Sequence, residues 1–195
     1  MRELERSCGD KMFVSHLGDT SISSILDHLF LSGSGAISPG ILKDKSITCI
    51  INVTHTEEFP TFLAEADFLR IGIDDTPRTK ISDHFDTAAD KIKMVKDTGG
   101  KVLIHCVQGV SRSASLCIVY LMKYEGMSLR KAYYHVKKVR PIIAPNIGFW
   151  KQMIEYETQI YGKSTVTIER TKHKFHYCIK FDDKTSFKQL GFIVL

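Results

Sequence analysis

Two residues that could do chemistry, Cys106 and Arg112, lie six positions apart in the middle of the sequence. The residues between them are small or uncharged: Val107, Gln108, Gly109, Val110 and Ser111. An apolar run of strand length (residues 101–105) precedes the cysteine, and residues 113–124 have the length and composition of a helix. The pattern therefore predicts a short loop joining a strand to a helix, with a nucleophile at one end and a cation at the other.

A loop of this kind is suited to binding a phosphate group. The start of a helix offers unpaired backbone N–H groups and a positive dipole end, while Gly109 and Ser111 leave the backbone room to curl around an anion. The same field stabilises a thiolate, which is the reactive form of cysteine, and the Arg112 guanidinium matches two phosphate oxygens. A buried structural cysteine beside a surface arginine is the alternative. The combination of strand, loop and helix favours a catalytic cysteine.

The stretch LIHCVQGVSRSASLCIVYLMKY, residues 103–124, resembles the signature region of cysteine-dependent protein tyrosine phosphatases. With the later RPIIAPNIGFW, the chain is similar to the dual-specificity phosphatases, and within them to the small atypical members. The resemblance covers about residues 20–162. It implies a protein-tyrosine-phosphatase-like α/β fold. It also implies hydrolysis of phosphotyrosine, phosphoserine and phosphothreonine through a cysteinyl-phosphate intermediate, with no cofactor and no metal.

Hydrolysis of a phosphate ester also needs an acid that protonates the departing oxygen. Asp74 and Asp75 are adjacent candidates in a loop after the alternating run of residues 69–73, and the residues alone do not choose between them. The resemblance does, because it places the general acid ten residues before an aromatic that opens a helix. Counting back from Phe85 gives Asp75. Asp74 stays the alternative acid, and a turn-capping role would also account for it.

Three further residues have predicted supporting roles. Ser113 could donate a hydrogen bond to the Cys106 sulfur, although an ordinary helix N-cap would also explain a serine there. By resemblance, the His105 ring holds the cysteine loop through hydrogen bonds, and a role as base is disfavoured because a thiolate has no proton to remove. Asn146 is similar to a family residue that steadies this loop.

Hydrophobic periodicity predicts strands alternating with helices. The expected strands are 28–32, 47–53, 69–73 and 101–105. The expected helices begin at the N-caps Ser38, Ser82 and Ser128, near Ser113, and after Asn146. This order indicates an α/β fold with a central, twisted, mostly parallel sheet flanked by helices. Ligands bind beyond the carboxyl ends of such strands, so the loops after 73 and 105 are expected to share one rim.

We divide the chain into three parts. Residues 1–19 are polar and aperiodic, which predicts a flexible N-terminus. Residues 20–162 form the predicted catalytic domain. Residues 163–195 form a predicted C-terminal extension, a β-hairpin packed on the domain, because two runs in it alternate between apolar and polar side chains. The apolar residues of these runs are Val166, Ile168, Phe175, Tyr177, Ile179 and Phe181.

Composition narrows the class of protein. The chain has 195 residues and a formal net charge of +5, with no apolar run long enough to span a membrane. Its five scattered cysteines include no C-x-x-C pair, which argues against a disulfide scaffold or a zinc site. Cys49 and Cys117 lie in apolar segments and are expected in the core. We expect a cytoplasmic protein, with the nucleus or an organelle as alternatives.

The expected partners are phosphorylated proteins, with MAP-kinase-pathway or other signalling proteins as candidates. Nucleic-acid binding is not expected, since no basic run is interleaved with aromatic residues. Two other functions stay open: a pseudophosphatase that only binds phosphoproteins, and a phosphatase for a non-protein phosphate ester. By resemblance, the lack of Lys or Arg between Cys106 and Arg112 disfavours inositol lipids. The sequence does not predict the oligomeric state.

Overall fold

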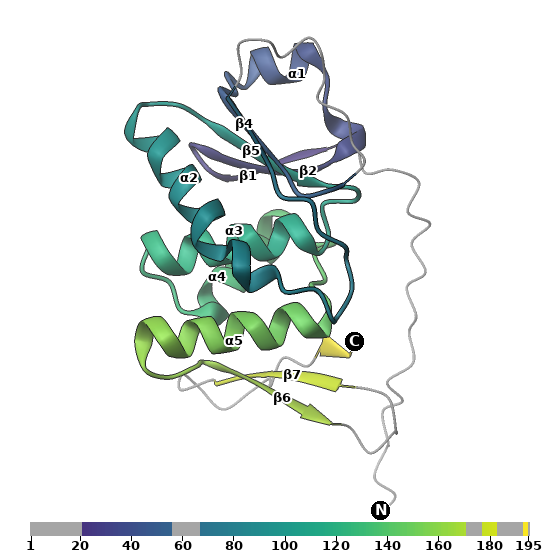
Figure 1. Cartoon of the computed structure of the whole chain (residues 1–195), viewed down its shortest axis with the longest axis vertical. Coiled ribbons are helices and arrows are strands. Elements are labelled where there is room, and N and C mark those ends of the chain that lie inside the picture. Colours follow the sequence, from purple (N-terminus) through teal and green to yellow (C-terminus); the bar gives the residue numbers. More distant parts are fainter. Residues whose placement is uncertain (1–20, 56–66, 171–176, 183–192, 195) are drawn as a thin grey trace, which may run out of the picture.

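The computed structural model describes residues 21–55, 67–170, 177–182 and 193–194. Its centre is a five-stranded sheet in the order β1-β2-β5-β3-β4 (Figure 1). The strands are β1 (Ile22–Leu26), β2 (Leu29–Gly33), β3 (Cys49–Asn52), β4 (Asp67–Arg70) and β5 (Val102–Cys106). Only β1 is antiparallel to its neighbour, so the prediction of a mostly parallel sheet is confirmed.

Helices cover both faces of this sheet. They are α1 (Pro39–Asp44), α2 (Phe85–Asp97), α3 (Arg112–Tyr124), α4 (Leu129–Val139) and α5 (Ile147–Tyr161). On one face, Phe30, Ile50 and Leu103 pack with Leu42 of α1. The other face, which includes Leu31, Ile51 and Ile104, joins the larger core formed with α2 to α5. Central strands buried on both faces explain the uninterrupted apolar runs in the sequence.

Most of the predicted helix starts are confirmed. The side chains of Ser38, Ser128 and Asn146 each accept a hydrogen bond from a backbone N–H of the helix that follows. The prediction that Ser82 caps α2 is wrong. Ser82 lies inside a short 3₁₀ helix, η3 (Ile81–His84), and its own N–H donates to Gln152 Oε1 at 2.9 Å.

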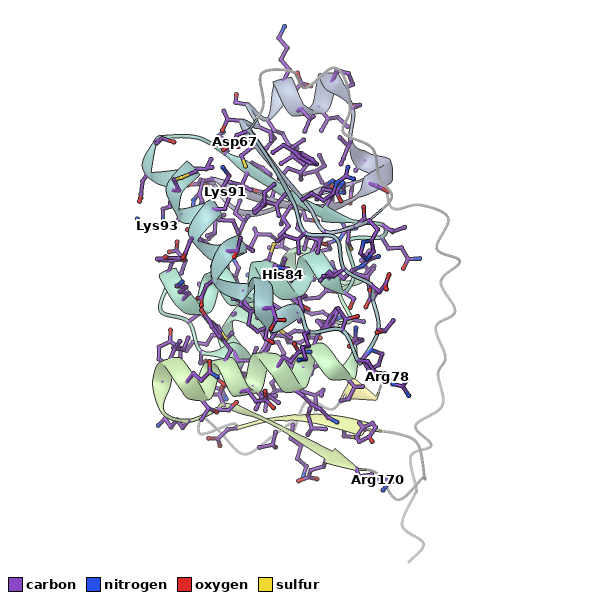
Figure 2. All side chains as sticks on the ribbon, viewed as in Figure 1. Asp67, Arg78, His84, Lys91, Lys93 and Arg170 are labelled. Carbon is purple, nitrogen blue, oxygen red and sulfur yellow. The ribbon has the colours of Figure 1, made fainter. Side chains whose placement is uncertain are left out.

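Two sheet predictions need correction. The strand expected at 69–73 ends at Arg70, although Ile71 and Ile73 are both buried. Their alternation with polar residues reflects packing of a loop on the core, not strand pairing. The sequence analysis also missed β1, an edge strand in which only Ile25 is buried, because one buried residue gives no detectable period. The ion pair between Lys91 of α2 and Asp67, both labelled in Figure 2, ties the opposite edge strand, β4, to α2.

A second, smaller sheet follows α5. It consists of β6 (Val166–Arg170), β7 (Tyr177–Phe181) and β8 (Ile193–Val194), paired antiparallel in that order. Phe181 is 2% exposed and its ring lies 5.6 Å from Tyr133 of α4 and 6.1 Å from Trp150 of α5, measured between centroids. The sheet therefore packs on α4 and α5 (Figure 1). The predicted N-terminal segment 1–19 lies outside the described residues, as does much of the predicted extension.

None of the helices in the described ranges combines the length and the apolar character needed to cross a membrane.

Glu157 of α5 connects the two parts of the structure. Its side chain is buried and accepts hydrogen bonds from the N–H of Leu129 (2.7 Å), the N–H of Thr165 (2.7 Å) and the hydroxyl of Ser164 (2.6 Å). One carboxylate thus fixes the start of α4 and the chain that enters β6.

We expect Glu157→Ala to destabilise the fold by about 3 kcal/mol, because it leaves buried N–H donors without acceptors. The measurement is urea unfolding followed by circular dichroism. Glu155→Ala, on the exposed side of the same helix, is the matched control and should change stability by less than about 0.5 kcal/mol. Equal unfolding curves for the two variants would contradict the connecting role of Glu157.

Candidate active site

Cys106 ends β5 and lies at the bottom of a short loop, residues 107–111, that leads into α3. The cysteine is 1% exposed. Its sulfur accepts hydrogen bonds from the backbone N–H of Gly109 and from the hydroxyl of Ser113, each at 3.2 Å. Two donors thus point at the atom that carries the negative charge in a cysteine thiolate. The structure thus places Ser113 inside α3, beside the sulfur, and not at the N-cap, which is Ser111.

The orientation of the loop's peptide groups explains how it can bind an anion. Four consecutive loop carbonyls accept hydrogen bonds from outside the loop, given by the N–H groups of Ser34 and Ala144 and by the Arg140 side chain. The acceptors are the carbonyls of Val107, Gln108, Gly109 and Val110. Because N–H and C=O point in opposite directions in a trans peptide, the N–H groups of residues 108–111 point to the inside of the loop.

Arg112 opens α3 at the other end of the loop. Its side chain is 12% exposed, and its Nη1 donates to the carbonyl of Ile73 at 3.1 Å, which holds the guanidinium over the loop. Its Nε is buried and has no hydrogen-bond partner among the described residues. Arg112 and Cys106 line one cavity of about 400 Å³, together with Asp75, Asn146 and residues of the loop.

Of the two candidate acids, only Asp75 lines this cavity. Its Oδ1 accepts hydrogen bonds from Ser111 Oγ and Asn146 Nδ2, both at 2.8 Å, and its Oδ2 lies 3.7 Å from Arg112 Nε. The Asp74 side chain is 73% exposed and lies 3.6 Å from the His55 ring. Burial and position therefore favour Asp75 over its neighbour.

Comparison with known proteins identifies the family of the chain. The family model described as the dual specificity phosphatase catalytic domain matches residues 29–159. The chain belongs to the dual-specificity phosphatase family. It is 46% identical to human dual specificity protein phosphatase 14, over 78% of this chain and 77% of that protein. It is 44% identical to mouse dual specificity protein phosphatase 18, over 74% and 77% of the two chains.

Solved structures show the same fold. The crystal structure of human DUSP28 superimposes with a TM-score of 0.69 at 31% identity, covering 71% of this chain and 94% of that one. The predicted resemblance and the predicted fold are thus both confirmed.

His105 precedes Cys106 in this dual-specificity phosphatase and is 3% exposed. Its Nδ1 lies 3.4 Å from the carbonyl oxygen of Cys106, in line with the predicted contact to the cysteine loop. Burial lowers the pKa of His105 to about 4, so the ring is neutral at physiological pH.

The other described cysteines lie in different surroundings. Cys49 and Cys117 are fully buried, as predicted, and burial raises the pKa of Cys49 to about 12 and that of Cys117 further still. Cys178 is half-buried on β7. Among the described cysteines, Cys106 alone lies in the anion-binding loop.

Ser111 and Asn146 contribute more than was predicted. Ser111 was assigned to phosphate binding, but its hydroxyl donates to Asp75 and also accepts a hydrogen bond from the Asn146 N–H at 3.2 Å. Asn146 in turn donates to Asp75 and caps α5. The loop, Asp75 and the start of α5 are therefore joined by one hydrogen-bonded group.

The sequence analysis missed Arg140, which appears there only within the stretch RPIIAPNIGFW. The residue is 1% exposed, and its guanidinium donates to Gly109 O at 2.8 Å and to Gln108 O at 3.0 Å. The only signal in the sequence was an arginine just before a proline, which is also a common way to end a helix.

Gly148 was missed as well. A Cβ at this position would lie 2.0 Å from the carbonyl oxygen of Pro77, in the loop that carries Asp75. The start of α5 can approach this loop only because residue 148 has no side chain. Arg78 of the same loop is labelled in Figure 2 and lies near the start of α5.

We expect Gly148→Ala to lower kcat by about a hundredfold, because the backbone of the Asp75 loop must move away. Competitive inhibition by inorganic phosphate should change little, since the cysteine loop keeps its own contacts. Steady-state kinetics with p-nitrophenyl phosphate measure both quantities. The control is Gly40→Ala, where an added Cβ meets nothing within 4 Å. A kcat of Gly148→Ala equal to that of the control would show that this contact does not position the acid.

Proposed function

We propose that this protein hydrolyses phosphotyrosine, phosphoserine and phosphothreonine in proteins through a cysteinyl-phosphate intermediate. One observation carries the proposal: the Cys106 sulfur lies at the bottom of a loop with inward N–H groups, in the same cavity as Arg112 and Asp75. The family membership supports it, since the relatives described above are named dual specificity protein phosphatases.

In the first step, the Cys106 thiolate attacks phosphorus and forms the S–P bond as the bond to the ester oxygen breaks. Arg112 and the inward N–H groups bind the three non-bridging oxygens and stabilise their charge in the transition state. The protonated carboxyl of Asp75 gives its proton to the departing oxygen. The released product is the dephosphorylated hydroxyl of the substrate.

In the second step, a water molecule attacks the phosphorus of the phosphocysteine. The Asp75 carboxylate takes the proton of this water, the S–P bond breaks, and inorganic phosphate leaves. The Ser113 hydroxyl, 3.2 Å from the sulfur, stabilises the thiolate as it forms again. Asp75 is thereby protonated again, and Cys106 is again a thiolate.

Several features support a phosphoprotein substrate. The cavity of about 400 Å³ is small, and its rim includes the exposed side chains of Val107 and Gln108. Neither carries a charge that would select a polyphosphorylated head group. Phosphorylated signalling proteins, including those of MAP-kinase pathways, are the proposed substrates. A thiolate nucleophile works in a reducing compartment, and we therefore propose a cytoplasmic site of action.

We expect hydrolysis of p-nitrophenyl phosphate in the presence of a metal chelator, with Cys106→Ser inactive. Asp75→Ala should lower kcat by about a hundredfold, because the leaving oxygen and the water lose their acid and base. Asp74→Ala is the matched control, and its kcat should stay close to that of the unmodified protein. The measurement is release of p-nitrophenol, followed by a panel of phosphopeptides.

Each alternative has its own signature in these data. Full activity of Cys106→Ser would exclude the cysteinyl-phosphate mechanism, and a slower Asp74→Ala than Asp75→Ala would reverse the assignment of the acid. Phosphopeptide binding without phosphate release would support a binding module instead. Faster turnover of phosphorylated RNA ends, glycans or lipids than of any phosphopeptide would identify a non-protein substrate.

A further inference from the structure

A furrow lies along one side of α4, away from the catalytic cavity. It consists of two adjoining hollows of about 690 Å³ and 330 Å³ that share Gly126 and Lys131. We call it the basic furrow and define it by Arg130, Lys131, Tyr134, His135, Lys138 and Lys163. None of these residues takes part in the proposed reaction.

The charge of the basic furrow is not balanced by its own carboxylates. Lys131, Lys138 and Lys163 are exposed, and no ion pair of theirs is found within the described residues. Two carboxylates line the hollows, but both have other partners. Glu125 is paired with Lys96 at 2.8 Å. The buried Glu157 accepts the hydrogen bonds described above. The furrow therefore attracts anions.

An aromatic surface lies among these charges. Tyr134 is 44% exposed, and its ring is held 4.9 Å from Phe181 and 5.6 Å from Tyr133 between centroids. A ring fixed by its neighbours offers apolar contact area at little cost in side-chain entropy. Lysines beside a fixed aromatic ring match a protein segment that combines acidic and apolar side chains.

The furrow also leads toward the catalytic loop. α4 has 11 residues, about 16 Å at 1.5 Å per residue, and Arg140 follows directly at its end. Arg140 binds Gly109 and Gln108 of the catalytic loop. Lys138 therefore lies two residues from a side chain that holds this loop, while Lys131 lies at the other end of α4.

We propose that the basic furrow docks an acidic segment of the protein substrate, at a distance from the phosphorylated residue. The carboxylates of this segment pair with Lys131, Lys138 and Lys163, and an apolar side chain packs on Tyr134. Exposed ion pairs are individually weak and screened by salt, so docking raises the rate of encounter more than the strength of the final complex. The substrate role rests on the proposed phosphatase function, whereas the binding itself does not.

The binding experiment uses a fluorescein-labelled peptide of about twelve residues, rich in Glu with one Leu, and a second peptide with Gln in place of each Glu. Fluorescence anisotropy should show that the protein binds the Glu peptide more tightly. The double variant Lys131→Glu with Lys138→Glu should weaken this binding by at least about tenfold. Moderate salt should also weaken the binding of the Glu peptide. The charge-matched control, Lys43→Glu with Lys45→Glu, changes α1 on the opposite face of the sheet and should bind within about twofold (Figure 1).

The kinetic experiment attaches the same two peptides to a phosphotyrosine through a flexible linker of about ten residues, which spans roughly 18 Å. Reversal of Lys131 and Lys138 should raise KM for the Glu-containing substrate about fivefold and leave kcat unchanged. Turnover of p-nitrophenyl phosphate should stay the same in all variants, which shows that they fold. Lys131→Gln with Lys138→Gln is the milder second variant and should give a smaller change in the same direction.

Three results would overturn the docking proposal: equal binding of the Glu and Gln peptides, equal loss in both charge-reversed variants, or tighter binding of single-stranded RNA through the same lysines. Failure of the phosphatase proposal looks different. In that case no variant hydrolyses p-nitrophenyl phosphate, while the anisotropy data still decide whether the furrow binds acidic peptides.

Discussion

The structure depends on one constraint, the direction of the peptide groups between Cys106 and Arg112. N–H groups can point to a common centre only if the carbonyls on the other side have partners of their own. A free loop would turn some of these carbonyls inward and repel an anion. Here the partners are supplied from outside by Ser34, Ala144 and Arg140, which are distant from one another in the sequence. The fold can be understood as the means of bringing these donors to one place.

Each of these donors reaches the loop through a different part of the fold. Ser34 follows β2, which pairs in parallel with β5 and so ends beside Cys106. Arg140 follows α4, which returns along α3 to the end of the sheet where the loop lies. Ala144 lies just before α5, whose first residues contact the loop that carries Asp75. Asp75 and the anion-binding loop are therefore positioned by the same short stretch of chain, residues 140–148.

Sequence analysis succeeded where the structure of a residue is determined by its neighbours in the sequence. The strand, loop and helix around Cys106 were predictable because their residue types and spacing describe a complete unit. Ser38, Ser128 and Asn146 were predictable caps because a cap acts within four residues. Prediction failed where the cause was tertiary. Serine is a common N-cap residue, but Ser82 lies in a 3₁₀ turn, where its N–H contacts Gln152. Nothing near Arg140 or Gly148 in the sequence reveals the distant carbonyls that each one meets.

Arg140 does not only contact the catalytic loop. Its Nη1 also lies 3.4 Å from the carbonyl of Ser21 and 3.4 Å from the hydroxyl of Ser23, at the outer edge of the main sheet. Edge strands open more readily than central ones, because neighbouring chain protects one side only. Local opening of β1 would thus loosen Arg140 and disturb the loop next to Cys106 while the core stays folded. Heat would then abolish turnover before it melts the protein, so that inactivation and global unfolding become separate events.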